Sequence, residues 1–413
     1  MKSQVRKAGY YSNSEIMARW LAIVCSYVIP ACMFFILLGN PIGNSFLVSW
    51  ATRIQIVITV ASGAVAILSC FVNGINEKSS VLLVALIFLT ILTLLSEGIG
   101  AILSGLIPYL CFFMLPFYII IFKKLENTKS IKQTIYVWNV IYALLFIILS
   151  FTDLAHVYYG EYGIKYLEEI TLGYGNPNET GIYLLISFMI MLTAYEENKD
   201  SKRLLSYGAL ILSVILFTMV QATKSRICII LALVVTVCKI LKIKAHKSKG
   251  IITLCFALPA ISLAIAMLVP DLFKDITILQ DGVITGRDYL YQAFFKKLNV
   301  FSFFLGNFSL YNSNNLHNSY LSVFARFGFL GFIVFIVFLY VSFLEYKDNL
   351  GDKKYSTPFV SLLCVIVHGV AEATLLVSGV VYGGFVGLLF LLTKQDSEEE
   401  KFLQVKSRAG GLQ

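Results

Sequence analysis

The chain has 413 residues, of which 58% are hydrophobic and 14% are charged, and its formal net charge is +9. Soluble domains usually carry about 25% charged residues, so a chain with a mean hydropathy of +0.79 could not cover a water-exposed surface. The composition excludes a separate soluble domain and predicts one integral membrane domain over residues 1–413.

The start of the chain predicts a first span that is retained rather than cleaved as a signal peptide. Lys2, Arg6, Lys7 and Arg19 precede a long apolar segment that begins at Trp20. No small-residue cleavage site follows a short apolar core, as a signal peptide would require.

Apolar segments then recur at lengths near the ~20 residues that a membrane-spanning helix needs. They predict an all-α polytopic membrane protein with about twelve transmembrane helices, at Trp20–Leu38, Ile54–Val72, Val81–Leu95, Ala101–Phe122, Ile135–Phe151, Gly181–Tyr195, Leu204–Val220, Arg226–Leu241, Ile251–Val269, Phe327–Leu344, Pro358–Glu372 and Leu375–Leu392. All eight cysteines fall inside these segments and no C-x-x-C pair occurs. The sequence therefore predicts neither a disulfide framework nor a zinc site.

The distribution of lysine and arginine predicts the orientation of these spans. If the N-terminus is cytoplasmic, 24 of the 33 basic residues fall in cytoplasmic segments, and an even number of spans makes the C-terminus cytoplasmic as well. Two larger loops then face outward, Thr152–Thr180 and the loop 270–326 between spans nine and ten. In the second loop, apolar side chains along Arg287–Leu298 predict a helix on the membrane surface or over the mouth of the bundle.

Basic residues are depleted on the outside, so the few that remain there are candidates for binding an anion. Arg226 opens a span, where free helix amides attract anions and a guanidinium fork matches a phosphate. Arg287 follows Gly286, which permits close approach of a ligand. Two plainer interpretations stay open: Arg226 could extend to lipid headgroups, and Arg287 could pair with Asp288 at the surface.

His317 is the candidate base. It is one of four histidines and stands beside Asn318, where the outer loop returns to the membrane. A neutral imidazole there can take a proton from a hydroxyl near pH 7, although a hydrogen-bonded interfacial histidine fits the same pattern. Glu372, at the outer end of a span, could orient a base or an acceptor sugar, or could be an exposed carboxylate.

Several motifs are missing from the chain. It has no Asp-x-Asp, no Walker loop and no metal-ligand spacing of His, Cys or carboxylates. Their absence disfavours an enzyme that uses a metal-bound diphosphate and a pump driven by ATP. The sequence predicts no metal and no cofactor.

Five short motifs occur in a fixed order in the second half of the chain: Gly175-Asn176-Pro177-Asn178, Thr223-Lys224-Ser225-Arg226, Thr285-Gly286-Arg287, Leu316-His317-Asn318-Ser319-Tyr320 and Arg326-Phe327-Gly328-Phe329-Leu330-Gly331. Their order and spacing resemble the bacterial O-antigen polymerase and O-antigen ligase superfamily (Wzy and WaaL types), from about residue 175 to the end of the chain.

The resemblance implies a metal-independent, inverting glycosyltransferase of the GT-C class at the outer face of the bacterial cytoplasmic (inner) membrane. Its donor and acceptor would be undecaprenyl-diphosphate-linked oligosaccharides of O-antigen, capsule or exopolysaccharide. Its other partners would be membrane lipids, a flippase and a chain-length regulator, and no nucleic acid.

The resemblance also implies roles for individual residues. Arg226 and Arg287 would bind the diphosphate, and His317 would be the base. Lys224 departs from the family pattern, and we expect it to assist at the diphosphate. The residues expected to bind the acceptor or orient the base are Asn178, Asn318, Arg326 and Glu372.

Three other functions remain as alternatives. An O-antigen ligase would transfer the glycan to a final acceptor such as lipid A-core; the short, aromatic-rich outer loop favours a polymerase. A polysaccharide flippase would be expected to place charges within several spans, whereas here the charges gather on the outer side. A sensor or scaffold without catalysis would not require Arg226, Arg287 and His317 on one face.

Overall fold

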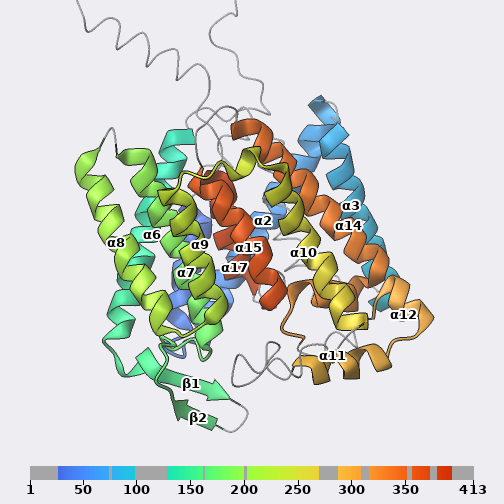
Figure 1. Ribbon diagram of the computed structural model, residues 1–413, viewed down its shortest axis with the longest axis horizontal. Helices are drawn as coiled ribbons and strands as arrows, with labels where there is room; N and C mark the ends of the chain where they lie inside the picture. The colour runs from blue at the N-terminus through green and yellow to red at the C-terminus, as the bar shows by residue number, and fades with distance from the viewer. Residues whose placement is uncertain are drawn as a thin grey trace, which may run out of the picture.

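The computed structural model describes residues 27–73, 77–97, 128–160, 163–199, 202–268, 287–307, 316–350, 356–372 and 379–392. These residues are mostly helical (Figure 1), which confirms the expected helical architecture. Within them, five helices are long and apolar enough to cross a membrane: Ser45–Val65, Ser130–Ser150, Arg203–Ala222, Lys249–Met267 and Ser319–Leu344. The expected span Ala101–Phe122 lies outside the described residues.

An apolar helix at Tyr27–Gly39 comes first. The helices that follow are α2 (Ser45–Asn73), α3 (Glu77–Glu97), α6 (Thr128–Ser150), α7 (Pro177–Asn198), α8 (Arg203–Ala222), α9 (Arg226–Ile240), α10 (Lys249–Leu268), α11 (Arg287–Lys296), α12 (Val300–Leu305), α14 (Ser319–Leu350), α15 (Thr357–Ala371) and α17 (Gly379–Leu392). Short 3₁₀ turns occur at Asp153–His156 and Ala245–Lys247.

Helix α7 is the centre of the bundle. It packs against α6, α8, α9, α15 and α17, and every residue from Thr180 to Ala194 is buried. Helix α8, in contrast, has a large exposed apolar surface that includes Leu204, Ile211 and Val214. Such a surface suits a helix that faces lipid, because apolar side chains there remain out of water.

A two-stranded hairpin marks one end of the bundle. Strand β1 (Val157–Gly160) pairs antiparallel with β2 (Gly163–Tyr166), with Val157 opposite Tyr166. This segment was expected to be part of the loop Thr152–Thr180, and the hairpin within it was not predicted. Helices α11 and α12 lie at the same end of the bundle (Figure 1), which we call the hairpin end.

Helix α11 covers the bundle with its apolar face. Phe294 is fully buried, and its ring and that of Phe295 lie 6.3 and 6.1 Å from the ring of Phe324 in α14. Of the two expected placements for this helix, the structure has the one in which it lies over the bundle.

Helix α14 begins at Ser319, eight residues before the expected start of that span at Phe327, and it is broken at Gly328 (φ 67°, ψ −171°). Gly306, which ends α12, has nearly the same conformation (φ 84°, ψ 174°). A Cβ on Gly328 would lie 2.3 Å from the carbonyl of Phe304, and one on Gly306 would lie 2.0 Å from the carbonyl oxygen of Arg326. The two backbones therefore touch where only glycine fits.

Candidate functional site

Four of the expected residues meet at the hairpin end, where α7 and α14 begin and α15 ends. Asn178 Nδ2 donates a hydrogen bond of 2.9 Å to Glu372 Oε1. The other carboxylate oxygen, Oε2, lies 3.7 Å from His317 Nδ1, and Asn318 follows His317 directly. Glu372 is only 7% exposed, so its carboxylate is enclosed between the amide and the imidazole.

Local backbone geometry places both ends of the Asn178–Glu372 contact. Asn176 is the N-cap of α7, and its side chain accepts from the backbone N–H of Asn178. Pro177 occupies the first helical position, where its fixed φ favours helix initiation. Glu372 is the C-cap of α15 in an extended conformation (φ −140°, ψ 146°), and its N–H donates to His368 O. Each side chain therefore projects from a helix end.

Asn318 joins α14 to the end of α15. Its Oδ1 accepts the backbone N–H groups of Tyr320 and Leu321, which caps α14. Its Nδ2 donates to Val370 O at 2.8 Å. Because both polar atoms of this buried amide form hydrogen bonds within the protein, Asn318 holds the end of α15 next to His317.

His317 has a left-handed backbone (φ 44°), which is uncommon outside glycine. Leu172 and Lys224, on two other segments of the hairpin end, are also left-handed (φ 48° and 53°), as is Lys242 (φ 52°) in the turn after α9. Such strain concentrates at functional sites. The His317 side chain is 37% exposed, so a substrate can reach its imidazole.

The separation of 3.7 Å between His317 and Glu372 is too long for a hydrogen bond. The carboxylate nevertheless attracts an imidazolium at this distance, and catalytic contacts often tighten when substrate binds. The arrangement therefore places an enclosed carboxylate beside an accessible imidazole.

Arg226, the first residue of α9, is exposed, and it forms no hydrogen bond or ion pair in the part of the chain that the structure describes. The start of α9 packs tightly on α7, since a Cβ on Gly181 would lie 3.0 Å from Ser225 Cβ and 3.1 Å from Cys228 Sγ. Cys228 Sγ in turn lies 3.5 Å from His368 Nε2 on α15. These contacts hold Arg226 at the hairpin end.

Lys224 already has acidic partners. Its Nζ lies 2.9 Å from Glu168 Oε2 and 3.6 Å from Glu169 Oε1. The hydrogen bond from Lys224 holds the pKa of Glu168 below its usual value, and Glu168 likewise raises the pKa of Lys224. Lys224 thus ties the segment after β2 to the turn between α8 and α9.

The remaining two expected arginines lie on α11 and α14. Arg287 is the first residue of α11, and its side chain lies outside the described residues. Arg326 is 2% exposed, and its guanidinium carbon lies 5.4 Å from the centroid of the Phe327 ring. It stands beside the break at Gly328, about two and a half helical turns beyond His317.

His368 was not among the expected site residues, because it stands isolated in the sequence. This buried histidine contacts Cys228 and lies one helical turn before Glu372 on α15. The spacing of four residues between His368 and Glu372 within a predicted span was a usable signal, because it puts both on one face of a helix.

A cavity of about 310 Å³ lies elsewhere, between the helix Tyr27–Gly39 and α2. It is lined by Gly39, Asn40, Gly43, Ser45, Val48 and Ser49. These residues include no group that titrates near neutral pH, so we place the candidate chemistry at the Glu372–His317 pair. Among the described residues, no group of three or more His, Cys, Asp or Glu could hold a metal ion.

Comparison of the chain with models of known protein families, with curated proteins and with solved structures finds no significant match.

Proposed function

We propose that this chain is a membrane glycosyltransferase that polymerises undecaprenyl-diphosphate-linked repeat units at the outer face of the bacterial cytoplasmic membrane. The fold we propose is GT-C-like with twelve spans, with the hairpin end outside and both termini in the cytoplasm. The observation that supports the proposal is the accessible imidazole of His317 backed by the enclosed carboxylate of Glu372.

In the proposed reaction, His317 takes the proton from an acceptor sugar hydroxyl. The hydroxyl oxygen attacks the anomeric carbon of the donor with inversion, and the bond to the diphosphate breaks, its electron pair leaving with the diphosphate. Glu372 stabilises the imidazolium, and Asn178 fixes the carboxylate by holding its second oxygen. General-base assistance of this kind contributes about 10²- to 10⁴-fold in rate.

The leaving diphosphate needs positive charge, which Arg226 and Arg287 supply in our proposal. Arg226 is exposed at the start of α9, where helix amides also favour an anion. Lys224 is a less suitable ligand for the diphosphate than the two arginines, because it is paired with Glu168. Arg226→Lys keeps the charge but loses the bidentate fork, so full polymer length in that variant would count against this diphosphate site.

The experiment that tests the proposal is a polymer ladder from cells that lack the native protein. The cells are complemented with wild type, His317→Ala or His156→Ala at equal membrane abundance. His156 is a matched control because it is also exposed at the hairpin end, with its Nδ1 3.2 Å from Glu169 O. We expect His317→Ala to leave single lipid-linked repeat units on the outer leaflet, and His156→Ala to leave the ladder intact.

Other outcomes would replace the proposal. Repeat units trapped on the cytoplasmic leaflet would identify a flippase. Long lipid-linked chains that never reach their final anchor would identify a ligase. An unchanged ladder with His317→Ala would remove His317 from the mechanism.

A further inference from the structure

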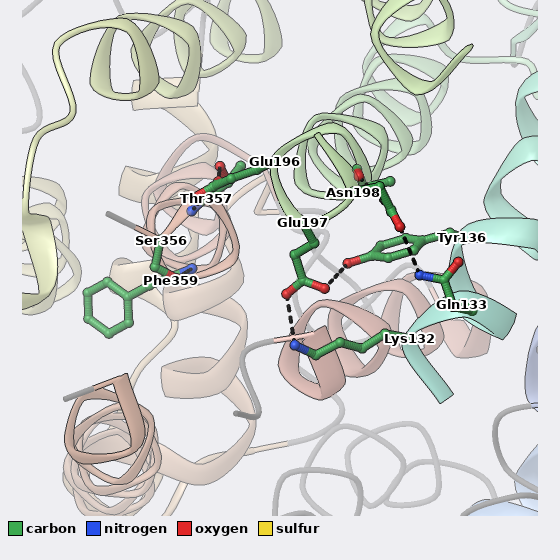
Figure 2. A network of polar contacts seen from close by, with 10 residues as sticks. Lys132, Gln133, Tyr136, Glu196, Glu197, Asn198, Ser356, Thr357 and Phe359 are labelled. Atoms are coloured by element: carbon green, nitrogen blue, oxygen red, sulfur yellow. Dashed lines mark hydrogen bonds and ion pairs between the residues drawn. The ribbon is translucent and has the colours of Figure 1, made fainter. Parts of the chain in front are cut away.

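A second polar network lies at the other end of α7 and ties that helix to α6. Glu197 accepts hydrogen bonds from Lys132 Nζ and from the Tyr136 hydroxyl, both at 2.8 Å (Figure 2). The next residue, Asn198, accepts one of 3.2 Å from Gln133 Nε2. We call this end of the bundle the network end. The Lys132 side chain is 5% exposed, whereas the Glu197 side chain is 28% exposed, so water reaches this ion pair from the Glu197 side.

The neighbouring carboxylate, Glu196, faces the opposite way and contacts the start of α15. It accepts from the backbone N–H of Thr357 at 3.3 Å and from the Thr357 hydroxyl. Figure 2 shows the two carboxylates diverging, Glu196 toward Thr357 and Glu197 toward Lys132 and Tyr136. The last turn of α7 is therefore fixed to α6 and α15 together.

Helices α7 and α15 run antiparallel and are joined by polar contacts at both ends. Glu196 meets Thr357 at the network end, and Asn178 meets Glu372 at the hairpin end. The residues between these contacts are almost all buried and apolar. In a bilayer, apolar packing between helices gains no hydrophobic driving force. Polar contacts between helices therefore contribute more to how the two helices are aligned along their axes.

The hydrogen bond between Asn178 and Glu372 is sensitive to the axial register of α7 against α15. One residue of an α-helix rises about 1.5 Å, and an N–H···O hydrogen bond extends to only about 3.2 Å. A slip of one residue between α7 and α15 would thus break the bond of 2.9 Å between Asn178 and Glu372. It would also move Glu372, together with the start of α14 that is hydrogen-bonded to the end of α15, relative to α7.

We propose that Glu196 and Thr357 are positioning residues for Glu372, acting from the far end of the two helices. Their contact sets the axial register of α15 against α7, and α6 holds α7 in place through Lys132 and Glu197. The effect on glycan transfer rests on the proposed function, whereas the effect on register does not.

Register is tested with the pair Asn178→Cys and Glu372→Cys, joined by a short bifunctional thiol reagent in the purified full chain. This pair removes the hydrogen bond between Asn178 and Glu372, so the Glu196–Thr357 contact becomes the remaining polar tie between the described residues of α7 and α15. We expect Thr357→Val to lower the cross-linking rate about threefold or more, the size of effect typical of one interhelical hydrogen bond in a membrane protein. Thr357→Ser should restore the rate, because it keeps the hydroxyl.

The matched control is Ser361→Ala. Ser361 is a buried hydroxyl one turn further along α15, and it donates to Thr357 O within its own helix at 2.9 Å. It should leave the cross-linking rate unchanged, and the two single-cysteine variants give the background. An equal rate in Thr357→Val and wild type would overturn the proposal.

The consequence for catalysis is measured in the chain that keeps Asn178 and Glu372. Thr357→Val should lower kcat about three- to twentyfold and leave KM for the lipid-linked repeat unit unchanged, with recovery in Thr357→Ser. A changed register with an unchanged kcat would separate Thr357 from catalysis. A wild-type protein that transfers no glycan would remove the proposed function and leave the cross-linking result standing.

Discussion

The carboxylate of Glu372 is held differently on its two sides. Asn178 contacts it at hydrogen-bonding distance, whereas His317 lies 3.7 Å away and stays accessible. The carboxylate is therefore held by a hydrogen bond on one side and faces the imidazole across a longer distance on the other. The charge of Glu372 should therefore matter more than its ability to accept a hydrogen bond from Asn178.

Glu372→Gln tests this distinction, because it removes the charge and keeps an oxygen that can accept a hydrogen bond. We expect kcat for transfer to fall about tenfold or more, as part of the general-base contribution is lost, with KM for the lipid-linked unit unchanged. Asn178→Ala should cost less, about two- to tenfold, since it removes one neutral donor. Steady-state kinetics of the two variants distinguishes these roles, and equal losses would argue against a charge effect.

The ion pair between Lys224 and Glu168 should make the attachment of the hairpin depend on pH. The pKa of Glu168 is lowered in the folded chain by Lys224, so the stabilising contact is fully present above the ordinary pKa of a glutamate and is lost as the pH falls through the lowered value. A spin label at Tyr166→Cys, a position that is 75% exposed, should become more mobile below about pH 4.

Lys224→Met should raise the mobility of that label slightly already at neutral pH and remove the transition; the effect is small because the ion pair is exposed and backbone hydrogen bonds such as Ile170 N to Ala222 O also hold the segment. Lys202→Met, at an exposed position before α8, is the control and should behave as wild type. A pH profile in Lys224→Met that matches wild type would show that other contacts hold the hairpin.

At the scale of elements, the contact between the end of α12 and the break in α14 attaches α12 to the bundle. Asn307 N donates to Ala325 O at 2.8 Å, which uses a carbonyl near the break. Gly306 and Gly328 both adopt a region of backbone space that is almost restricted to glycine. The attachment of α12 to α14 thus depends on glycine at both positions.

Gly328→Ala should lower the free energy of unfolding by about 1–3 kcal/mol from backbone conformation alone, and more from the overlap with the Phe304 carbonyl. Gly208→Ala is the control, because Gly208 lies within α8 and a Cβ there meets nothing within 4 Å. It should be neutral or stabilising by up to about 1 kcal/mol. Thermal unfolding in one detergent compares the two, and equal stabilities would contradict the close contact.

Continuous apolar stretches made several helices predictable. The expected spans Leu204–Val220 and Ile251–Val269 differ by only one or two residues at each end from α8 (Arg203–Ala222) and α10 (Lys249–Leu268). The break at Gly328 was not predictable in the same way, because it depends on the approach of Phe304 and Gly306 from another element. The hairpin was missed because its strands have only four residues each.

The candidate site was predictable as a set of residues but not as a set of contacts. Polar groups such as His317 and Glu372 stand out at the ends of apolar spans. Their pairing depends on which helices are neighbours, and Asn178 and Glu372 are 194 residues apart in the chain. The role of Asn318 as a cap for α14 and a tie to α15 likewise appears only once both helices are in place.

At the scale of the whole molecule, the bundle has two chemically different ends. The hairpin end carries Arg226 and the Glu372–His317 pair, and the network end carries Lys132, Glu196 and Glu197. In our proposal the first faces outward and the second faces the cytoplasm, as the lysine and arginine distribution predicts.

Cysteines introduced one at a time at the two ends, in a chain whose eight native cysteines are replaced by alanine, test this orientation. Tyr166→Cys, in the exposed part of the hairpin, should react with a membrane-impermeant maleimide in intact spheroplasts. Lys249→Cys, at the exposed start of α10, should react only after the membrane is permeabilised. Reaction of both in intact spheroplasts, or the reverse pattern, would refute the proposed orientation.

The burial of α7 also has a consequence for the order in which the protein is built. Residues Thr180–Ala194 are enclosed by protein, yet the helix against which Glu196 rests begins 161 residues later, at Thr357. At about 5–20 residues per second, the ribosome needs roughly ten to thirty seconds to supply it. Through that interval α6, made earlier, can already pair Lys132 with Glu197, while Glu196 has no α15 to meet. We therefore expect an early stage of folding in which α6 and α7 are already paired while Glu196 still lacks its Thr357 partner.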